Sequence, residues 1–164
     1  MTGSMRDLNA RLRSARAPDA TAVAVLVDAA YGHYVARIGR QPSPMCEDYA
    51  EVIRTRAVTI AEHAGSIVGV IVLAVTGEGF LIENVAVRPS HQGRGIGKAL
   101  LQFAESQARR AGFDSVYLYT HEKMTENRAL YASLGYAQYE RGVGDAPRVY
   151  LRKQLGPLHG RSGS

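Results

Sequence analysis

The clearest periodicity in the chain lies in its second half. Between Ile96 and Ala111, apolar residues recur every three or four positions, which is the spacing of one helix face and predicts a helix over 97–111. Two short runs rich in apolar and aromatic residues, 80–87 and 115–120, flank this segment and are typical of strands. A strand, a helix and a strand in this order form a right-handed crossover, so the two strands are predicted to be parallel neighbours.

The first half of the chain changes from a helical to a strand pattern. The apolar run 22–31 predicts a helix with Asp19 as its N-cap, and 47–56 predicts a second helix. A glycine and two prolines interrupt the segment 32–45 between them, which is predicted to be an ordered loop without a regular element. The other predicted elements are strands over 13–17, 57–62, 66–75, 136–140 and 149–153, and a helix over 126–134 with Thr125 as its N-cap.

These elements predict an α/β fold with a mixed, mostly antiparallel sheet, a central parallel βαβ unit and helices on both faces. A length of 164 residues fits a single domain. The segments 1–10 and 156–164 are polar and contain glycine and serine, so both ends are expected to be flexible. The folded domain is therefore expected to span 11–155.

Composition narrows the class of protein. Hydrophobic residues make up 46% and charged residues 21%, as in ordinary globular domains. Cys46 is the single cysteine, so no intrachain disulfide can form. The longest apolar run, 67–75, is far shorter than the ~20 residues that span a bilayer, and 1–16 lacks the apolar core of a secretory signal. We expect a cytoplasmic protein that has no membrane partner.

The positive charge of the chain is scattered. Lys and Arg number 20 against 15 acidic residues, a formal net charge of +5, but no block of five like charges occurs. A solvated surface explains this pattern better than a nucleic-acid stripe, so no nucleic-acid partner is expected. The five histidines have no two-ligand spacing, and no metal is expected.

The strongest chemical signal is a glycine-rich loop just before the predicted helix 97–111. Gly93, Gly95 and Gly97 alternate there, and glycines let consecutive backbone N–H groups turn toward one point. At a helix N-terminus such groups form a cradle for a phosphate or pyrophosphate. Arg94 and Lys98 add positive charge at its rim.

Three ligands use cradles of this kind. A Walker A loop needs a glycine where Gln92 stands and a hydroxyl where Ala99 stands, so that interpretation fails twice. A dinucleotide-binding fingerprint needs a small residue in place of Lys98, and three predicted strands precede this unit. The pyrophosphate of coenzyme A is the third ligand. The remaining alternative is a glycine-rich turn that binds no ligand, which the entropic cost of three alternate glycines disfavours.

The segment VRPSHQGRGIGKALL, 87–101, resembles the acetyl-CoA motif of the GCN5-related N-acetyltransferase (GNAT) superfamily, Q/R-x-x-G-x-G/A. Gln92, Gly95 and Gly97 fill its three defining positions. A second segment, NRALYASLGY at 127–136, resembles the superfamily's last helix and following strand, with its tyrosine displaced by one place from the commonest spacing.

This resemblance extends in element order over 11–154 and implies a GNAT-like fold with acetyl-CoA as cosubstrate. In the family, the strand before the loop splays from its parallel neighbour and offers backbone groups to the pantetheine arm. On this chain those residues are Val85, Ala86 and Val87. The resemblance also implies that Asn127 hydrogen-bonds the pantetheine. The residues that would contact the pyrophosphate are Gln92, Gly93, Arg94, Gly95, Ile96, Gly97 and Lys98.

Acetyl transfer to an amine needs a proton acceptor, because an alkylamine with a pKa of ~10.4 is protonated at pH 7. Glu83 is the candidate base, directly or through a water. Strand alternation predicts that it shares a face with Val85 and Val87 while Asn84 points the other way, and that burial raises its pKa. The alternative is that Glu83 only pairs with an arginine.

The departing thiolate needs a proton, and the developing oxyanion needs a donor. The family resemblance puts Tyr131 near the thioester sulfur, where it would give that proton; the alternative is a tyrosine that only packs. A backbone N–H near Val85 could stabilise the oxyanion. Direct transfer in a ternary complex requires no covalent enzyme intermediate.

The acceptor side is less defined in the sequence. Tyr31, His33, Tyr34, Arg37 and Arg40 lie at the end of a predicted helix and in the following loop, where they would border the acceptor. Arginine there would bind a substrate carboxylate or phosphate, or would be a rim charge. RIGRQPSPM, 37–45, and LYTHEKMTEN, 118–127, resemble segments from a GNAT branch of unassigned substrate.

The function expected is therefore an acetyl-CoA-dependent N-acetyltransferase. A small-molecule amine and a protein amine both stay open as acceptors. The alternative is a CoA-binding sensor or structural module that has lost turnover. Homodimers are common in the family, so a second copy of the chain is a candidate partner.

Overall fold

The strands predicted from valine and isoleucine content form one mixed sheet in the computed structural model, which describes residues 10–141 and 148–156. Segments 1–9 and 157–164, which make up most of the predicted flexible ends, lie outside the described residues. The strands are β1 (Arg11–Ser14), β2 (Ala57–His63), β3 (Ser66–Thr76), β4 (Gly79–Val87), β5 (Ser115–His121), β6 (Ala137–Arg141) and β7 (Arg148–Gln154).

The order of the strands across the sheet is β1-β2-β3-β4-β5-β7-β6. Only β4 and β5 pair in parallel among the described residues; every other neighbouring pair is antiparallel. The predicted crossover is therefore confirmed. It places the helix after β4 against the sheet, at the point where the two halves of the sheet meet.

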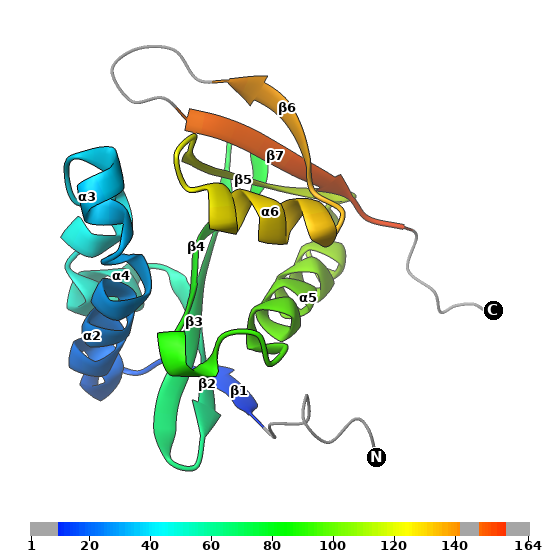
Figure 1. Ribbon diagram of the computed structural model, residues 1–164. Helices are drawn as coiled ribbons and strands as arrows, with labels where there is room; N and C mark the ends of the chain where they lie inside the picture. Colours follow the sequence, from blue (N-terminus) through cyan, green and yellow to red (C-terminus); the bar gives the residue numbers. More distant parts are fainter. Residues whose placement is uncertain (1–9, 142–147, 157–164) are drawn as a thin grey trace.

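Helices cover both faces of the sheet, as predicted (Figure 1). On one face lie α2 (Ala20–Tyr31), α3 (Tyr34–Ile38) and α4 (Tyr49–Thr55), and on the other lie α5 (Ile96–Arg110) and α6 (Thr125–Ser133). Each face has its own apolar cluster. Leu100 and Ala104 of α5 belong to one, and Val23 and Val27 of α2 belong to the other, all with no measurable exposure. Burial of such side chains contributes about 1.5–3 kcal/mol for each large aliphatic residue.

The segment 32–45 is not the irregular loop that was predicted. It holds α3 and a 3-10 turn, η2 (Ser43–Cys46). Gly39 ends α3 with a φ of 91° and donates its N–H to Val35 O at 2.8 Å. Pro44 lies in the first turn of η2, where a missing N–H costs nothing. The glycine and prolines therefore mark the ends of short helices.

Two smaller predictions are wrong, and a third is confirmed only in position. Asp19 is the N-cap residue of α2, as predicted, but its carboxylate does not cap that helix; it accepts from Arg16 N at 2.7 Å and so closes the turn η1 (Ala17–Asp19). Helix α6 begins at Thr125, and the residue at its N-cap is Met124. The first strand ends at Ser14, before the predicted 13–17 is complete, because the chain turns into η1 after pairing with β2.

Candidate active site

The parallel strands β4 and β5 pair over only two positions. Phe80 pairs with Val116 and Leu81 with Tyr117, after which β5 continues beside β7 and β4 continues beside β3 alone. Over 82–87, the edge of β4 that faces β5 therefore has no strand partner among the described residues. Backbone groups on an unpaired edge can bind an extended ligand, although in this stretch Val85 O and Val87 O already accept from the Tyr31 hydroxyl and the Gln92 amide. This is the splay that the family resemblance implies.

The glycine-rich loop follows this edge and leads into the N-terminus of α5. Gly93 and Gly95 have φ angles of 79° and 86°, in the left-handed region that favours glycine. The Gln92 side chain donates from Nε2 to Val87 O at 3.0 Å and fixes the loop to the end of β4. The first N–H groups of α5 have no partner within the helix, so they can bind an anion together with the helix dipole.

The other predicted loop residues divide into two kinds. Arg94 and Lys98 are exposed at the rim, as a role in neutralising a pyrophosphate requires. Ile96 is buried, so only its backbone can contribute. A Cβ on Gly97 would lie 3.7 Å from Val87 Cγ2 and 3.8 Å from Leu130 Cδ2, so this glycine lies between β4 and α6.

Strand β4 carries a bulge that changes which side chains share a face. Leu73 pairs with Ile82 and Val72 with Asn84, so Glu83 is the extra residue. Ile82 and Val85 both pack in the cluster beneath α5. Asn84 instead contacts Tyr31 of α2, and Glu83 pairs with Arg56 at the end of α4, so both lie on the other face. The prediction that Glu83 and Asn84 point to opposite faces is therefore wrong, because a bulge interrupts the alternation.

Glu83 pairs with Arg56, whose Nη1 lies 2.8 Å from Glu83 Oε2. Arg56 also lies 3.5 Å from the Glu47 carboxylate. Burial raises the pKa of Glu83 above the usual value of a glutamate; Arg56 opposes this shift and Glu47 adds to it. The arginine partner anticipated as an alternative is present, and so is the burial that a general base requires.

Asn84 is the centre of a buried hydrogen-bond chain. The Tyr31 hydroxyl lies 2.8 Å from Asn84 Oδ1 and 3.1 Å from Val85 O. Asn84 Nδ2 donates to Tyr49 Oη at 3.1 Å, and the Tyr49 hydroxyl donates to Pro44 O at 2.6 Å. Each partner comes from a different element, so the chain joins α2, α4 and η2 to the bulged part of β4. Burial raises the pKa of Tyr31 well above its ordinary value, so its hydroxyl stays protonated.

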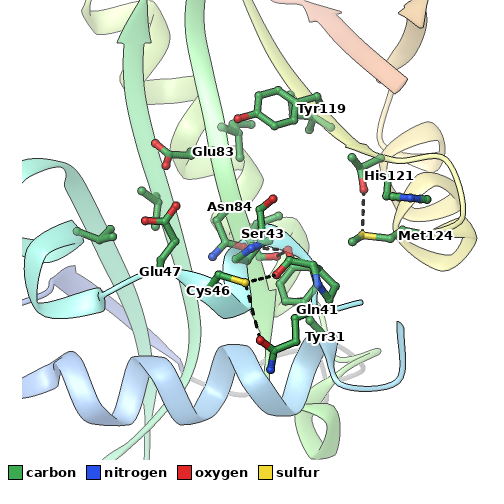
Figure 2. Close-up of a pocket in the computed structure, with 18 of the residues that line it drawn as sticks. Tyr31, Gln41, Ser43, Cys46, Glu47, Glu83, Asn84, Tyr119, His121 and Met124 are labelled. Atoms are coloured by element: carbon green, nitrogen blue, oxygen red, sulfur yellow. Dashed lines mark hydrogen bonds between the residues drawn. The ribbon is translucent and has the colours of Figure 1, made fainter. Parts of the chain in front are cut away.

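A cavity of about 620 Å³ opens beside the bulge. Its walls come from α2, the segment 38–49, β4, β5, the start of α6 and the first residue of β7 (Figure 2). A cavity of this size suits a small organic molecule. Its polar and charged lining residues are Tyr31, Arg40, Gln41, Ser43, Cys46, Glu47, Asp48, Tyr49, Arg56, Glu83, Asn84, Tyr119, Thr120, His121, Tyr131 and Arg148.

Tyr131 of α6 lies where this cavity reaches the splayed strands. Both Tyr131 and Val85 line the cavity, and Val85 is also on the unpaired part of β4. The Tyr131 side chain is buried, and its hydroxyl has no hydrogen-bond partner among the described residues. Burial raises the pKa of this phenol, with a smaller contribution from Tyr34, so it carries its proton at neutral pH. A buried donor without a partner is uncommon and needs an explanation.

Asn127, Tyr34 and Arg37 form a second contact region at the start of α6. Asn127 N donates to Tyr34 Oη at 3.2 Å. The Arg37 guanidinium binds the Glu126 carboxylate through two contacts of 2.6 and 3.1 Å and lowers its pKa to about 2. Tyr34 and Arg37 do not line the cavity, whereas Tyr31 does. Their predicted acceptor contacts stay predictions, and the visible role of both is to join α3 to α6.

Sequence reasoning missed most of the cavity. Glu47 and Tyr49 flank the start of α4, Tyr119 and His121 end β5, and Arg148 opens β7. These residues are far apart in the chain, and only Tyr119 and His121 belong to a segment, 118–127, that the family resemblance singled out. The other available signal was the polar content of the interrupted segment 32–45.

Two further features bear on the type of site. No group of three or more His, Cys, Asp or Glu residues is placed to hold a metal ion within 10–141 and 148–156. In the same ranges, no helix has the length and apolar character needed to cross a membrane.

Comparison with known proteins gives the same architecture. The chain is 32% identical over 80 residues to an IAA acetyltransferase of Azospirillum brasilense. The match covers 48% of this chain and 52% of that relative, so it spans about half of the relative's length. A GCN5-related N-acetyltransferase structure from Rhodopseudomonas palustris matches at a TM-score of 0.74, with 21% identity, over 89% of this chain and 96% of that one.

A second solved structure, the PaiA N-acetyltransferase of Thermoplasma acidophilum in complex with coenzyme A, also matches at a TM-score of 0.74. Its identity is 17%, over 89% of this chain and 99% of that one. The family model for the acetyltransferase (GNAT) family matches residues 22–136, which include the bulged strand, the glycine-rich loop and Tyr131. The chain is a member of the acetyltransferase (GNAT) family.

Proposed function

We propose that the chain is an acetyl-CoA-dependent N-acetyltransferase that transfers the acetyl group directly to a primary amine within a ternary complex. One observation carries this proposal: a single cavity is lined by both Glu83 and Tyr131, whose hydroxyl has no hydrogen-bond partner within 10–141 and 148–156, and the same cavity reaches Val85 on the splayed part of β4. Acetyl-CoA supplies the acetyl group as a thioester.

The residues that would hold acetyl-CoA fit its chemistry. A diphosphate needs several converging N–H donors, and the loop offers the backbone of 93–98 with Arg94 and Lys98 exposed beside it. A pantetheine amide needs strand-like partners, which the unpaired part of β4 provides at 85–87. Asn127 stands in the first turn of α6. PaiA from Thermoplasma acidophilum was solved with coenzyme A, and the same fold supports that ligand here.

The chain's side chains then divide the proton transfers. Glu83 accepts the proton that an ammonium must lose before its nitrogen can attack, and its raised pKa makes it a better acceptor than an exposed glutamate. A backbone N–H near Val85 stabilises the oxyanion. Tyr131 gives its proton to sulfur as the carbon–sulfur bond breaks, and regains one from the new amide nitrogen. The balance is one carbon–nitrogen bond formed, one carbon–sulfur bond broken and one proton released.

The direct test follows free thiol release with acetyl-CoA and a panel of small primary amines. The proposal expects acetylated product and thiol in equal amounts with at least one small amine. Acetylation of peptide amines alone would overturn the small-molecule acceptor. Tight binding of acetyl-CoA without turnover on any amine or peptide would instead favour the CoA-binding sensor as the function.

A further inference from the structure

The charges that line the cavity are segregated. Glu47 and Glu83 converge on Arg56, at 3.5 and 2.8 Å, so this group carries a net charge of −1. Figure 2 shows the two carboxylates on the same side of the cavity and His121, at the end of β5, on the opposite side. Arg40 and Arg148 also line the cavity.

The cationic lining residues come from other elements than the two carboxylates: Arg148 from β7 and Arg40 from the segment between α3 and η2. Arg148 stands across from His121 in the β5–β7 register, and its guanidinium lies over the Tyr119 ring at 4.3 Å from the centroid. Burial lowers the pKa of the His121 imidazole below its ordinary value. The nearby charges of Lys123 and Arg40 lower it further, and Glu122 opposes them. His121 is therefore neutral at pH 7.

The tautomer of His121 follows from its backbone contact. Lys123 N donates to His121 Nδ1 at 3.0 Å, so Nδ1 is the acceptor and the proton is on Nε2. A neutral imidazole with this tautomer presents an N–H donor. The side of the cavity with Arg40 and Arg148 thus has two guanidinium groups and one N–H.

The arginines of the molecule differ in how they are paired. Arg13, Arg37, Arg54 and Arg56 each form a salt bridge with a carboxylate. Arg40 and Arg148 form none with any carboxylate of the described residues. Guanidinium groups that have no carboxylate partner in the part of the chain that the structure describes, on the wall of a cavity of about 620 Å³, are suited to bind an anionic group on a small ligand.

We propose that the acceptor amine carries an anionic group, a carboxylate or a phosphate, that binds between Arg40, Arg148 and the His121 Nε2–H while its ammonium lies toward Glu83 and Glu47. This inference rests on the proposed function and names the substrate class of that site. The opposed charges orient the ligand, because reversing it would bring the anion against two carboxylates and the ammonium against two arginines.

The test compares amines of equal chain length: butylamine, 1,4-diaminobutane, 4-aminobutanoate and 3-aminopropyl phosphate. We expect kcat/KM for one or both anionic amines to exceed that for butylamine by about tenfold or more, the strength of a charged hydrogen bond. Whichever anionic amine gives the larger value identifies carboxylate or phosphate as the group. Butylamine or the diamine as the best substrate would overturn the proposal.

Two variants separate recognition from folding. Arg40→Gln and Arg148→Gln should each raise KM for the anionic amine about tenfold, and should lower kcat/KM for the anionic amine about tenfold more than kcat/KM for butylamine. Arg54→Gln is the matched control, since Arg54 is exposed on α4 and pairs with Glu51. Equal losses with anionic and neutral amines would show a structural role for these arginines and contradict the proposal.

The failure of the proposed function would look different. If no amine is acetylated by any variant, the proposed acetyltransferase function fails. The proposed recognition of an anionic amine is then tested by calorimetry with 4-aminobutanoate, 3-aminopropyl phosphate and butylamine. Tighter binding of an anionic amine that is lost in Arg40→Gln supports it. Equal affinities for the anionic and neutral amines overturn it.

Discussion

The glycine-rich loop and the cavity lie at opposite ends of the proposed reaction path and are built in opposite ways. The loop is one continuous segment, 92–98, whose proposed ligand contacts are made by backbone N–H groups. The cavity takes its side chains from seven separate parts of the chain, and the Asn84 hydrogen-bond chain joins α2, α4 and η2 to β4. The two regions meet where Val85 and Tyr131 lie.

This difference separates two kinds of specificity. A cradle of backbone groups depends on φ angles, so it tolerates changes in most side chains but not the loss of a left-handed glycine. A cavity of side chains depends on tertiary packing, so single substitutions there alter acceptor preference and leave the cradle intact. Substitutions in the glycine-rich loop should therefore change the affinity for acetyl-CoA. Substitutions in the cavity should change the preference for the acceptor and the turnover rate.

The largest effect is expected from Gly95→Val. Gly95 has a φ of 86°, and a β-branched residue there costs about 1–2 kcal/mol and displaces the loop amides. We expect the affinity for acetyl-CoA to fall by about 1,000-fold or more, measured by calorimetry. Gly112→Val is the control, because Gly112 has a φ of 90° at the other end of α5 and no loop amide. Similar loss of affinity in both variants would mean that strain alone is responsible.

Tyr131→Phe should act on turnover. Removing the phenol proton is expected to lower kcat about 100-fold while the affinity for acetyl-CoA changes by less than about threefold. Steady-state kinetics and calorimetry on the same preparation give both quantities. Tyr136→Phe is the control: its hydroxyl donates to Glu105 at 2.8 Å, outside the cavity, so it should lower stability and spare kcat. Equal losses of binding and turnover in Tyr131→Phe would exclude a proton donor.

Glu83→Gln should lower kcat about tenfold at pH 7 and change its pH dependence. A base works only when deprotonated, and burial raises the pKa of Glu83, so activity should decline as the pH falls through a value above 4.5. In the variant this acidic decline should disappear. Glu47→Gln removes the other carboxylate at Arg56, and in this control variant activity should still decline at acidic pH. An unchanged pH profile in Glu83→Gln would exclude Glu83 as the base.

The smallest effect is expected from Arg37→Gln. Arg37 binds Glu126 on the surface and does not line the cavity, so KM for every amine should change less than about twofold. The lowered pKa of Glu126 means that this contact stabilises the fold above pH 4.5 and is lost as the pH falls toward about 2. A tenfold rise in KM for one amine would restore Arg37 as an acceptor-binding residue and move the acceptor toward α6.

How much of this could be read from the sequence depends on how local each feature is. The crossover β4–α5–β5 and the loop at 92–98 follow from periodicity and adjacent glycines, and their positions were predicted within a residue or two. The direction of Glu83 was not predictable, because one bulge opposite Val72 and Leu73 reverses the strand alternation. The side chains of Glu47, His121 and Arg148 converge only through tertiary packing, which leaves no pattern in the chain.

The account depends most on where acetyl-CoA lies. A crystal structure of the chain with acetyl-CoA should have the diphosphate oxygens within hydrogen-bond distance of the N–H groups of 93–98. It should also have the thioester sulfur beside the Tyr131 hydroxyl, at the Val85 end of the cavity. A diphosphate bound away from this loop, or a sulfur outside the cavity that holds Glu83, would contradict the account.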